Sequence, residues 1–135
     1  MTQIDHLGIA VKSLAEAKQF YEKLGLEVMP EETVESEKVR VAMVPMGESR
    51  IELLEPTVPE STIAKFLEKR GQGLHHVALH VTDLVGTVER LKASGTRLIN
   101  QEIKVGAGGH RYVFVHPSSA GGVLLELVED AGHVG

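Results

Sequence analysis

The sequence predicts an α+β fold built from two copies of one βαβββ module, and this prediction depends mainly on an internal repeat. Residues 4–11 (IDHLGIAV) and 74–81 (LHHVALHV) resemble each other at a spacing of 70 residues. Ser13 and Asp83, which can each cap a helix, fall at the same spacing, and β-rich segments follow both predicted helices. We therefore expect two modules related by pseudo-twofold symmetry that form an open, cup-shaped mixed β-sheet.

Each module contains one predicted helix with its own start and stop signals. The first covers residues 14–24 and the second covers residues 84–94. Each follows its capping residue, and Gly25 and Gly95 can end them in the left-handed conformation. The first helix should bury one stripe of side chains: Leu14, Ala17, Tyr21 and Leu24.

Three short β-rich segments follow each of these helices. They cover residues 26–30, 39–46 and 50–55 in the first half, and residues 97–102, 111–116 and 122–128 in the second. A further helix is predicted at residues 61–70, between the two halves. We expect one domain over residues 1–135, with module one at 1–56, a connector at 57–73 and module two at 74–130.

The composition narrows the classes of function. The chain has 135 residues, of which 42% are hydrophobic, as expected for one globular domain. Cysteine is absent, so a metal ion would be held by imidazole and by carboxylate or amide oxygen. A net charge of -5 and an aromatic content of 4% argue against a nucleic-acid surface. No secretory signal or apolar span of about 18 residues is present, which predicts a cytoplasmic protein without a membrane partner.

Two histidines occupy matching places in the first strands of the two modules. Because side chains alternate along a strand, His6 and His76 lie on the face opposite the bulky apolar residues. His75 lies on the other face, so His76 is the ligand candidate and His75 is not. Small residues such as Gly8 and Ala78 share the histidine face, which indicates an open cup instead of a packed core.

Two glutamates, Glu52 and Glu126, occupy matching places in the last strands among apolar neighbours. A carboxylate there is costly unless it is paired or bound to a cation. Pseudo-twofold symmetry would bring His6, Glu52, His76 and Glu126 to one centre that suits divalent cobalt, manganese, nickel, zinc or iron. Each pair taken singly also has a plainer interpretation, a structural histidine and a solvated glutamate.

Several longer motifs resemble the methylmalonyl-CoA epimerases, a family within the vicinal-oxygen-chelate superfamily. They are residues 51–56 (IELLEP), the connector leading to residues 73–78 (GLHHVA), and residues 122–127 (GVLLEL) after His116 and Pro117. Carried over position by position, the resemblance implies His6, His76 and Glu126 as metal ligands. Glu52 stands where some members have glutamine. Val41 stands where some members carry a glutamate that has been proposed as a base.

The resemblance also implies an activity. It is metal-dependent epimerisation of methylmalonyl-CoA at C2, by 1,1-proton transfer through a metal-stabilised enolate. Glu126 is the first candidate for a catalytic carboxylate and Glu52 is the second. Cobalt is the first candidate for the metal, ahead of manganese, nickel and zinc, and the expected partners are an acyl-CoA substrate and a second copy in a homodimer. Two alternatives stay open: a glyoxalase I-type lyase acting on a glutathione hemithioacetal, and a non-catalytic ligand-binding protein of the same fold.

Overall fold

A computed structural model describes residues 3–106 and 109–129. The chain divides into two compact units, one formed by His6–His75 and the other by Met1–Asp5 with His76–Gly135. We call them the N-terminal unit and the C-terminal unit. In each, a first strand is followed by one helix and three further strands, as the repeat predicts, and the N-terminal unit also contains the connector helix.

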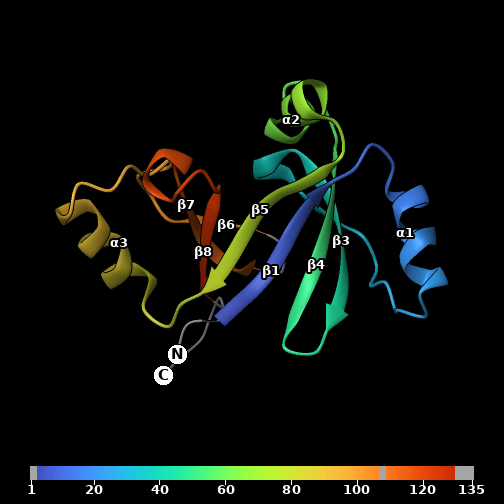
Figure 1. Cartoon of the computed structure of the whole chain (residues 1–135), viewed down its shortest axis with the longest axis horizontal. Coiled ribbons are helices and arrows are strands. Elements are labelled where there is room, and N and C mark those ends of the chain that lie inside the picture. The colour runs from blue at the N-terminus through green and yellow to red at the C-terminus, as the bar shows by residue number, and fades with distance from the viewer. Residues whose placement is uncertain (1–2, 107–108, 130–135) are drawn as a thin grey trace. The chain divides into compact units, whose positions relative to one another are not determined.

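The N-terminal unit holds one βαβββ module and a connector helix (Figure 1). Its elements are β1 (Gln3–Ala10), α1 (Leu14–Lys23), β2 (Glu32–Val34), β3 (Val39–Met46), β4 (Ser49–Pro56) and α2 (Thr62–Arg70), with a short 3-10 turn at Glu35–Glu37. The strand order is β2-β3-β4-β1. β1 runs parallel to β4, and the other neighbours are antiparallel.

The C-terminal unit repeats this arrangement. Its elements are β5 (Gly73–His80), α3 (Leu84–Ala93), β6 (Lys104–Val105), β7 (Arg111–Val115) and β8 (Leu125–Glu129), with a 3-10 turn at Pro117–Ser119. The strand order is β5-β8-β7-β6, and β5 runs parallel to β8. The α+β class, the mixed strand directions and the two βαβββ modules are therefore confirmed.

The predicted helix signals are confirmed with one exception. Ser13 accepts a hydrogen bond from the Glu16 amide, and Asp83 accepts one from the Gly86 amide. Gly25 has a φ of 86°, in the left-handed region that glycine tolerates best. The prediction that Leu24 belongs to the buried stripe was wrong, because Leu24 is the C-cap residue and its side chain is 59% exposed.

Two predicted strands were wrong. Residues 26–30 form no strand, although Leu26 and Val28 pack against the core of the N-terminal unit, and the short β2 follows them. Residues 97–102 make only an isolated bridge, between Leu98 and Val115. The Asn100 side chain accepts the Phe114 amide hydrogen there, so a side chain replaces the backbone carbonyl that a continuing strand would supply. In both segments, apolar residues contribute packing without forming a regular ladder.

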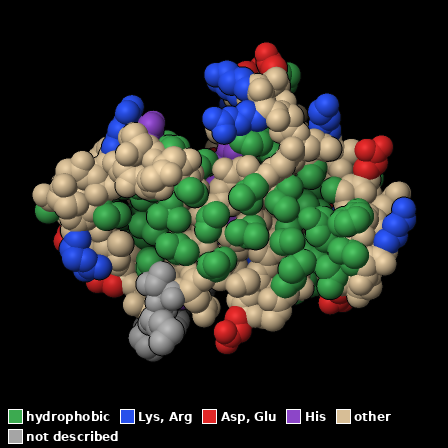
Figure 2. Space-filling view, in the orientation of Figure 1, with side chains coloured by type: hydrophobic (Ala, Val, Ile, Leu, Met, Phe, Trp, Pro, Cys, Tyr) green, Lys and Arg blue, Asp and Glu red, His purple; other side chains and the backbone are tan. Residues whose placement is uncertain are grey.

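Each unit has its own hydrophobic core on the helix side of its strands. In the N-terminal unit the core contains Val11, Leu14, Ala42, Val44 and Leu53. In the C-terminal unit it contains Val81, Leu84, Val88, Leu98, Val113, Val115 and Leu127. On the face drawn in Figure 2, hydrophobic side chains gather over the strands of both units, and Lys and Arg side chains gather over α2. Among the described residues, no helix is long and apolar enough to cross a membrane.

Candidate metal centre

The first candidate pair consists of His6 on β1 and Glu52 on β4, both within the N-terminal unit. Their side chains are 4% and 8% exposed, and His6 Nδ1 lies 3.3 Å from Glu52 Oε2. β1 and β4 are parallel neighbours that place Gly8 directly beside Glu52. Because Gly8 has no side chain, the Glu52 carboxylate can lie toward His6 across the strands. The alternation predicted for β1 and β4 therefore brings this imidazole and this carboxylate together.

Arg50 completes this pair on the same face of β4. Its Nη2 and Nε atoms lie 2.8 Å and 3.0 Å from Glu52 Oε2, the same oxygen that faces His6. The Arg50 side chain is only 19% exposed. A buried carboxylate is stabilised when a guanidinium and further hydrogen bonds compensate its charge. Arg50 thus compensates the buried charge of Glu52 in the N-terminal unit.

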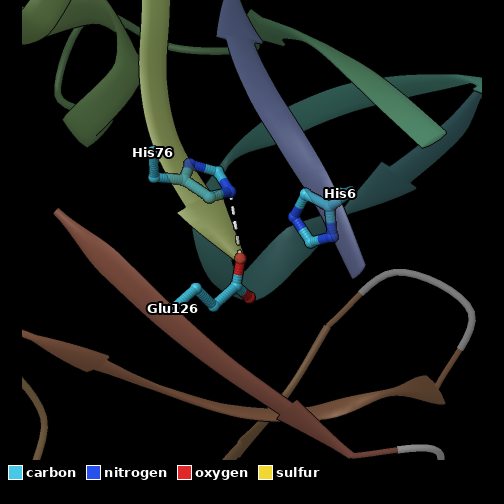
Figure 3. Close-up of side chains that lie close together, drawn as sticks. All are labelled: His6, His76 and Glu126. Carbon is cyan, nitrogen blue, oxygen red and sulfur yellow. Dashed lines mark ion pairs between the residues drawn. The ribbon is translucent and has the colours of Figure 1, made fainter. Parts of the chain in front are cut away.

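The second candidate pair consists of His76 on β5 and Glu126 on β8. The side chains point toward each other in Figure 3, and His76 Nε2 lies 3.0 Å from Glu126 Oε1. Both residues are buried, at 6% and 8% exposure. Parallel pairing of β5 with β8 places Ala78 beside Glu126, as Gly8 lies beside Glu52. The same local geometry therefore occurs once in each module.

Aromatic side chains border the second pair. Phe114 on β7 pairs directly with Glu126, and its ring meets the His76 ring edge to face at 5.4 Å. Tyr112 continues this aromatic row, with its ring 5.7 Å from that of Phe114. Together with Val128 they cover Ala78, which is fully buried. The expectation of an open face at Ala78 was therefore wrong, because the small residue makes room for aromatic side chains from a neighbouring strand.

The structure also gives His75 and His116 contacts outside these pairs. His75, one residue before His76, lies against Phe66 of α2, with ring centroids 4.9 Å apart. The alternation argument that excluded His75 as a ligand is consistent with this contact. His116 Nδ1 accepts a hydrogen bond from the Ser118 amide and so caps the turn at Pro117–Ser119. This contact of His116 is local.

Both pairs offer the donor atoms that a divalent ion of borderline character prefers. Each provides one imidazole nitrogen and one carboxylate oxygen, and the chain has no cysteine that would favour softer metals. Burial raises the affinity of such donors for a cation, because an unpaired buried carboxylate is costly. The residues present therefore fit a divalent metal ion.

Sequence reasoning did not assign roles to Arg50 or Phe114 at this site. Arg50 was recognisable, because a basic residue two positions before Glu52 shares its face of the strand. Phe114 could not be found in the same way, because its place beside Glu126 depends on the register between β7 and β8. The signal for Arg50 is therefore local in the sequence, and the signal for Phe114 is not.

The chain belongs to the Glyoxalase/Bleomycin resistance protein/Dioxygenase superfamily, whose model matches residues 5–114. Within it, the chain belongs to the family of methylmalonyl-CoA epimerases. It is 39% identical to the mitochondrial methylmalonyl-CoA epimerase of Bos taurus, over 93% of this chain and 73% of that protein. It is 38% identical to the ethylmalonyl-CoA/methylmalonyl-CoA epimerase of Cereibacter sphaeroides, over 93% of this chain and 96% of that one. An uncharacterized protein of Bacillus subtilis, YqjC, is 42% identical, over 98% of this chain and 95% of that protein.

Solved structures support the same assignment. A methylmalonyl-CoA epimerase from Mycobacterium tuberculosis is 40% identical, with a TM-score of 0.89 over 95% of this chain and 87% of that one. A methylmalonyl-CoA epimerase in complex with methylmalonyl-CoA and NH4+ is 37% identical, with a TM-score of 0.92 over 98% of this chain and 96% of that one. The family and the fold predicted from the sequence are thus confirmed.

Proposed function

We propose that this chain catalyses the epimerisation of methylmalonyl-CoA at C2, with a divalent metal ion held by His6, His76 and Glu126. One observation carries the proposal: a buried pair of histidine and glutamate occurs at the matching place in each module. The family of the chain adds support, because its relatives include an epimerase solved with methylmalonyl-CoA. The proposal joins the two modules at one site, as the predicted pseudo-twofold symmetry requires.

The proposed ligands combine one imidazole from each module with the carboxylate of Glu126. Each of the three side chains, drawn in Figure 3, is buried. Cobalt is the first candidate, and manganese, nickel and zinc are the alternatives. When bound, such an ion would supply a Lewis acid that stabilises negative charge on the thioester oxygen of the substrate.

Glu126 is the first candidate to take the C2 proton. It lies on β8 next to Phe114, and Tyr112 extends the aromatic row that limits access of water. Phe114 and Tyr112 would protect the reacting carbon from solvent.

Inversion also requires a proton to return from the opposite face of C2. Val41 occupies the strand position at which some epimerases carry a glutamate, and its side chain is apolar and 3% exposed. It cannot exchange a proton. Glu52 is the second candidate carboxylate, and water is the alternative donor.

The test is proton NMR of methylmalonyl-CoA in deuterated buffer, with cobalt-loaded protein and with protein treated with a chelator. We expect metal-dependent loss of the C2 proton signal at a rate well above the background without protein. Absence of exchange with any of the four metals would reject the epimerase proposal. Formation of lactoylglutathione from the hemithioacetal would then identify the lyase alternative.

The proposed partners are an acyl-CoA substrate and a second copy of the chain. The homodimer stays a prediction from the family resemblance, and the cytoplasmic location stays a prediction from the sequence. Light scattering coupled to size-exclusion chromatography tests the first directly: we expect about twice the chain mass of 14.6 kDa. A monomer at micromolar concentration would reject the homodimer and leave the proposed chemistry untouched.

A further inference from the structure

We infer that Tyr112 is a positioning residue that limits the size of the C2 substituent that this chain accepts. In this assignment Phe114 forms the wall against which the methyl group of methylmalonyl-CoA lies, and Tyr112 prevents that wall from moving away. The inference rests on the proposed function and deepens it, because it names which acyl-CoA substrates the same site takes. Both residues belong to the C-terminal unit.

Strand register places Phe114 between two other rings on the face of the sheet that carries Glu126. Glu126 on β8 pairs with Ala78 on one side and with Phe114 on the other, so these residues form one row across the strands. β5 runs parallel to β8 and β7 runs antiparallel to it. His76, two residues before Ala78, and Tyr112, two residues before Phe114, therefore fall on opposite sides of this row. The Phe114 ring contacts both, with centroids 5.4 Å from His76 and 5.7 Å from Tyr112.

The Tyr112 ring is held between Phe114 and the backbone at Gly106. β6 pairs Lys104 with Tyr112 in antiparallel register, so Gly106 lies on the side of Tyr112 away from Phe114. A side chain at position 106 would bring its Cβ atom to 3.0 Å from Tyr112 Cε1, closer than the about 3.5 to 4.0 Å at which carbon atoms pack. The Gly106 amide donates a hydrogen bond to the His110 carbonyl at 2.8 Å, which fixes this backbone. Glycine therefore lets the Tyr112 ring lie against a fixed support.

The groups on C2 of the substrate differ in the surroundings that they favour. The thioester and the carboxylate favour polar or charged partners, and the hydrogen faces Glu126 in the proposed reaction. Only the methyl group favours an apolar surface. Phe114 pairs directly with Glu126 and is only partly buried, whereas Tyr112 next to it is 3% exposed. Phe114 therefore provides the surface for the methyl group, and Tyr112 supports that surface.

The matching positions of the N-terminal unit hold aliphatic side chains. Met43 on β3 pairs with Glu52. Val41 stands two residues before Met43, as Tyr112 stands two residues before Phe114. An unbranched methionine adapts its shape to its surroundings more readily than an aromatic ring does. The rigid wall is therefore a feature of the C-terminal unit.

A rigid wall at C2 makes a difference of one methylene group measurable. Ethylmalonyl-CoA differs from methylmalonyl-CoA by one methylene at C2, and one methylene in an apolar pocket changes kcat/KM by roughly 10- to 200-fold. We therefore expect the wild-type protein to prefer methylmalonyl-CoA by at least about 10-fold in kcat/KM. A smaller residue at position 112 gives the Phe114 ring room to move, so it should admit the ethyl group and lower this preference.

The experiment measures kcat/KM for each substrate from the loss of its C2 proton signal in deuterated buffer, with cobalt-loaded protein. Tyr112→Val should lower the preference for methylmalonyl-CoA by about 10-fold or more. Tyr112→Phe keeps the ring and removes the hydroxyl, so it should keep the wild-type preference. Val113→Ala is the matched control for loosened packing, because Val113 is 0% exposed in the core on the opposite face of β7. It should lower the stability and leave the preference unchanged.

The outcomes separate failure of this inference from failure of the proposed function. Equal kcat/KM values for the two substrates in the wild-type protein, or a wild-type preference in Tyr112→Val, would overturn the role of Tyr112 and keep the epimerase. A change in Tyr112→Phe or Val113→Ala as large as that in Tyr112→Val would also overturn it. If circular dichroism shows that Tyr112→Val does not fold, Tyr112→Leu, which keeps more of the buried volume, is measured against the same controls. Absence of exchange of methylmalonyl-CoA by the wild-type protein would reject the proposed function, and this inference with it.

Discussion

The two pairs of histidine and glutamate occupy matching positions in the sequence repeat but differ in their contacts. His76 meets Glu126 through Nε2, next to the aromatic ring of Phe114. His6 meets Glu52 through Nδ1, next to the guanidinium of Arg50. Matching backbone positions therefore define where a side chain lies, while the neighbouring residues determine what it can do. Variants of the two pairs test whether they differ in function as they do in their surroundings.

The largest expected effect follows from changing the carboxylate of the second pair. Glu126→Gln should lower the rate of C2 proton exchange by about 10² to 10⁴, the usual contribution of a positioned acid or base. The NMR assay in deuterated buffer measures it. Glu52→Gln is the matched variant in the other module, and it should lower the rate by less than Glu126→Gln does, because Glu52 is only the second candidate carboxylate. Equal losses of exchange rate in the two variants would show that the two glutamates have the same role.

A smaller effect is expected when one of the two proposed histidine ligands is replaced. His6→Gln and His76→Gln should each weaken cobalt binding by at least about 100-fold, above the range for outer-shell partners. Isothermal titration calorimetry measures the affinity. His75→Gln provides the control, because His75 packs on Phe66 of α2. If His75→Gln weakened binding as much as His76→Gln, the alternation argument for the first strands would fail.

The repeat allowed much of the fold to be predicted from the sequence. Caps such as Ser13 and Asp83 act on amides three residues away, so their signal is local, and both helices begin where expected. The strand predictions at residues 26–30 and 97–102 were wrong for a different reason. Apolar residues there serve packing, and the hydrogen bond from the Phe114 amide to Asn100 could not be read from the pattern.

The sequence was enough to propose candidate residues for the site but not to predict their contacts. Strand alternation assigned His6, His76, Glu52 and Glu126 to their faces. It could not show which ring nitrogen meets each carboxylate, because that depends on side-chain rotamers and strand register. The covering of Ala78 by Tyr112 and Phe114 escaped prediction for the same reason. Periodicity therefore finds candidate residues, and their roles follow from neighbours on other strands.

The hydrophobic cores of the two units also contain matching residues. Leu53 and Leu127 occupy matching positions beside Glu52 and Glu126, and they are 0% and 5% exposed. Leu53→Ala and Leu127→Ala should each lower the free energy of unfolding by about 2 to 5 kcal/mol, from lost burial and the cavity left behind. Urea unfolding followed by circular dichroism measures both. A loss of less than about 1 kcal/mol for either variant would contradict the assignment of that leucine to a core.

The smallest expected difference lies in an ion pair that the repeat also duplicates. Arg40 pairs with Glu55 in the N-terminal unit, and Arg111 pairs with Glu129 in the C-terminal unit. Glu129 additionally accepts the Leu84 amide hydrogen at the start of α3, at 2.8 Å. Glu55→Ala should therefore lower the free energy of unfolding by less than about 1 kcal/mol, as for exposed ion pairs. Glu129→Ala should cost about 1 to 3 kcal/mol, because it leaves a buried amide without its acceptor. Equal costs, measured by urea unfolding, would show that Glu129 stabilises α3 no more than an ordinary surface pair does.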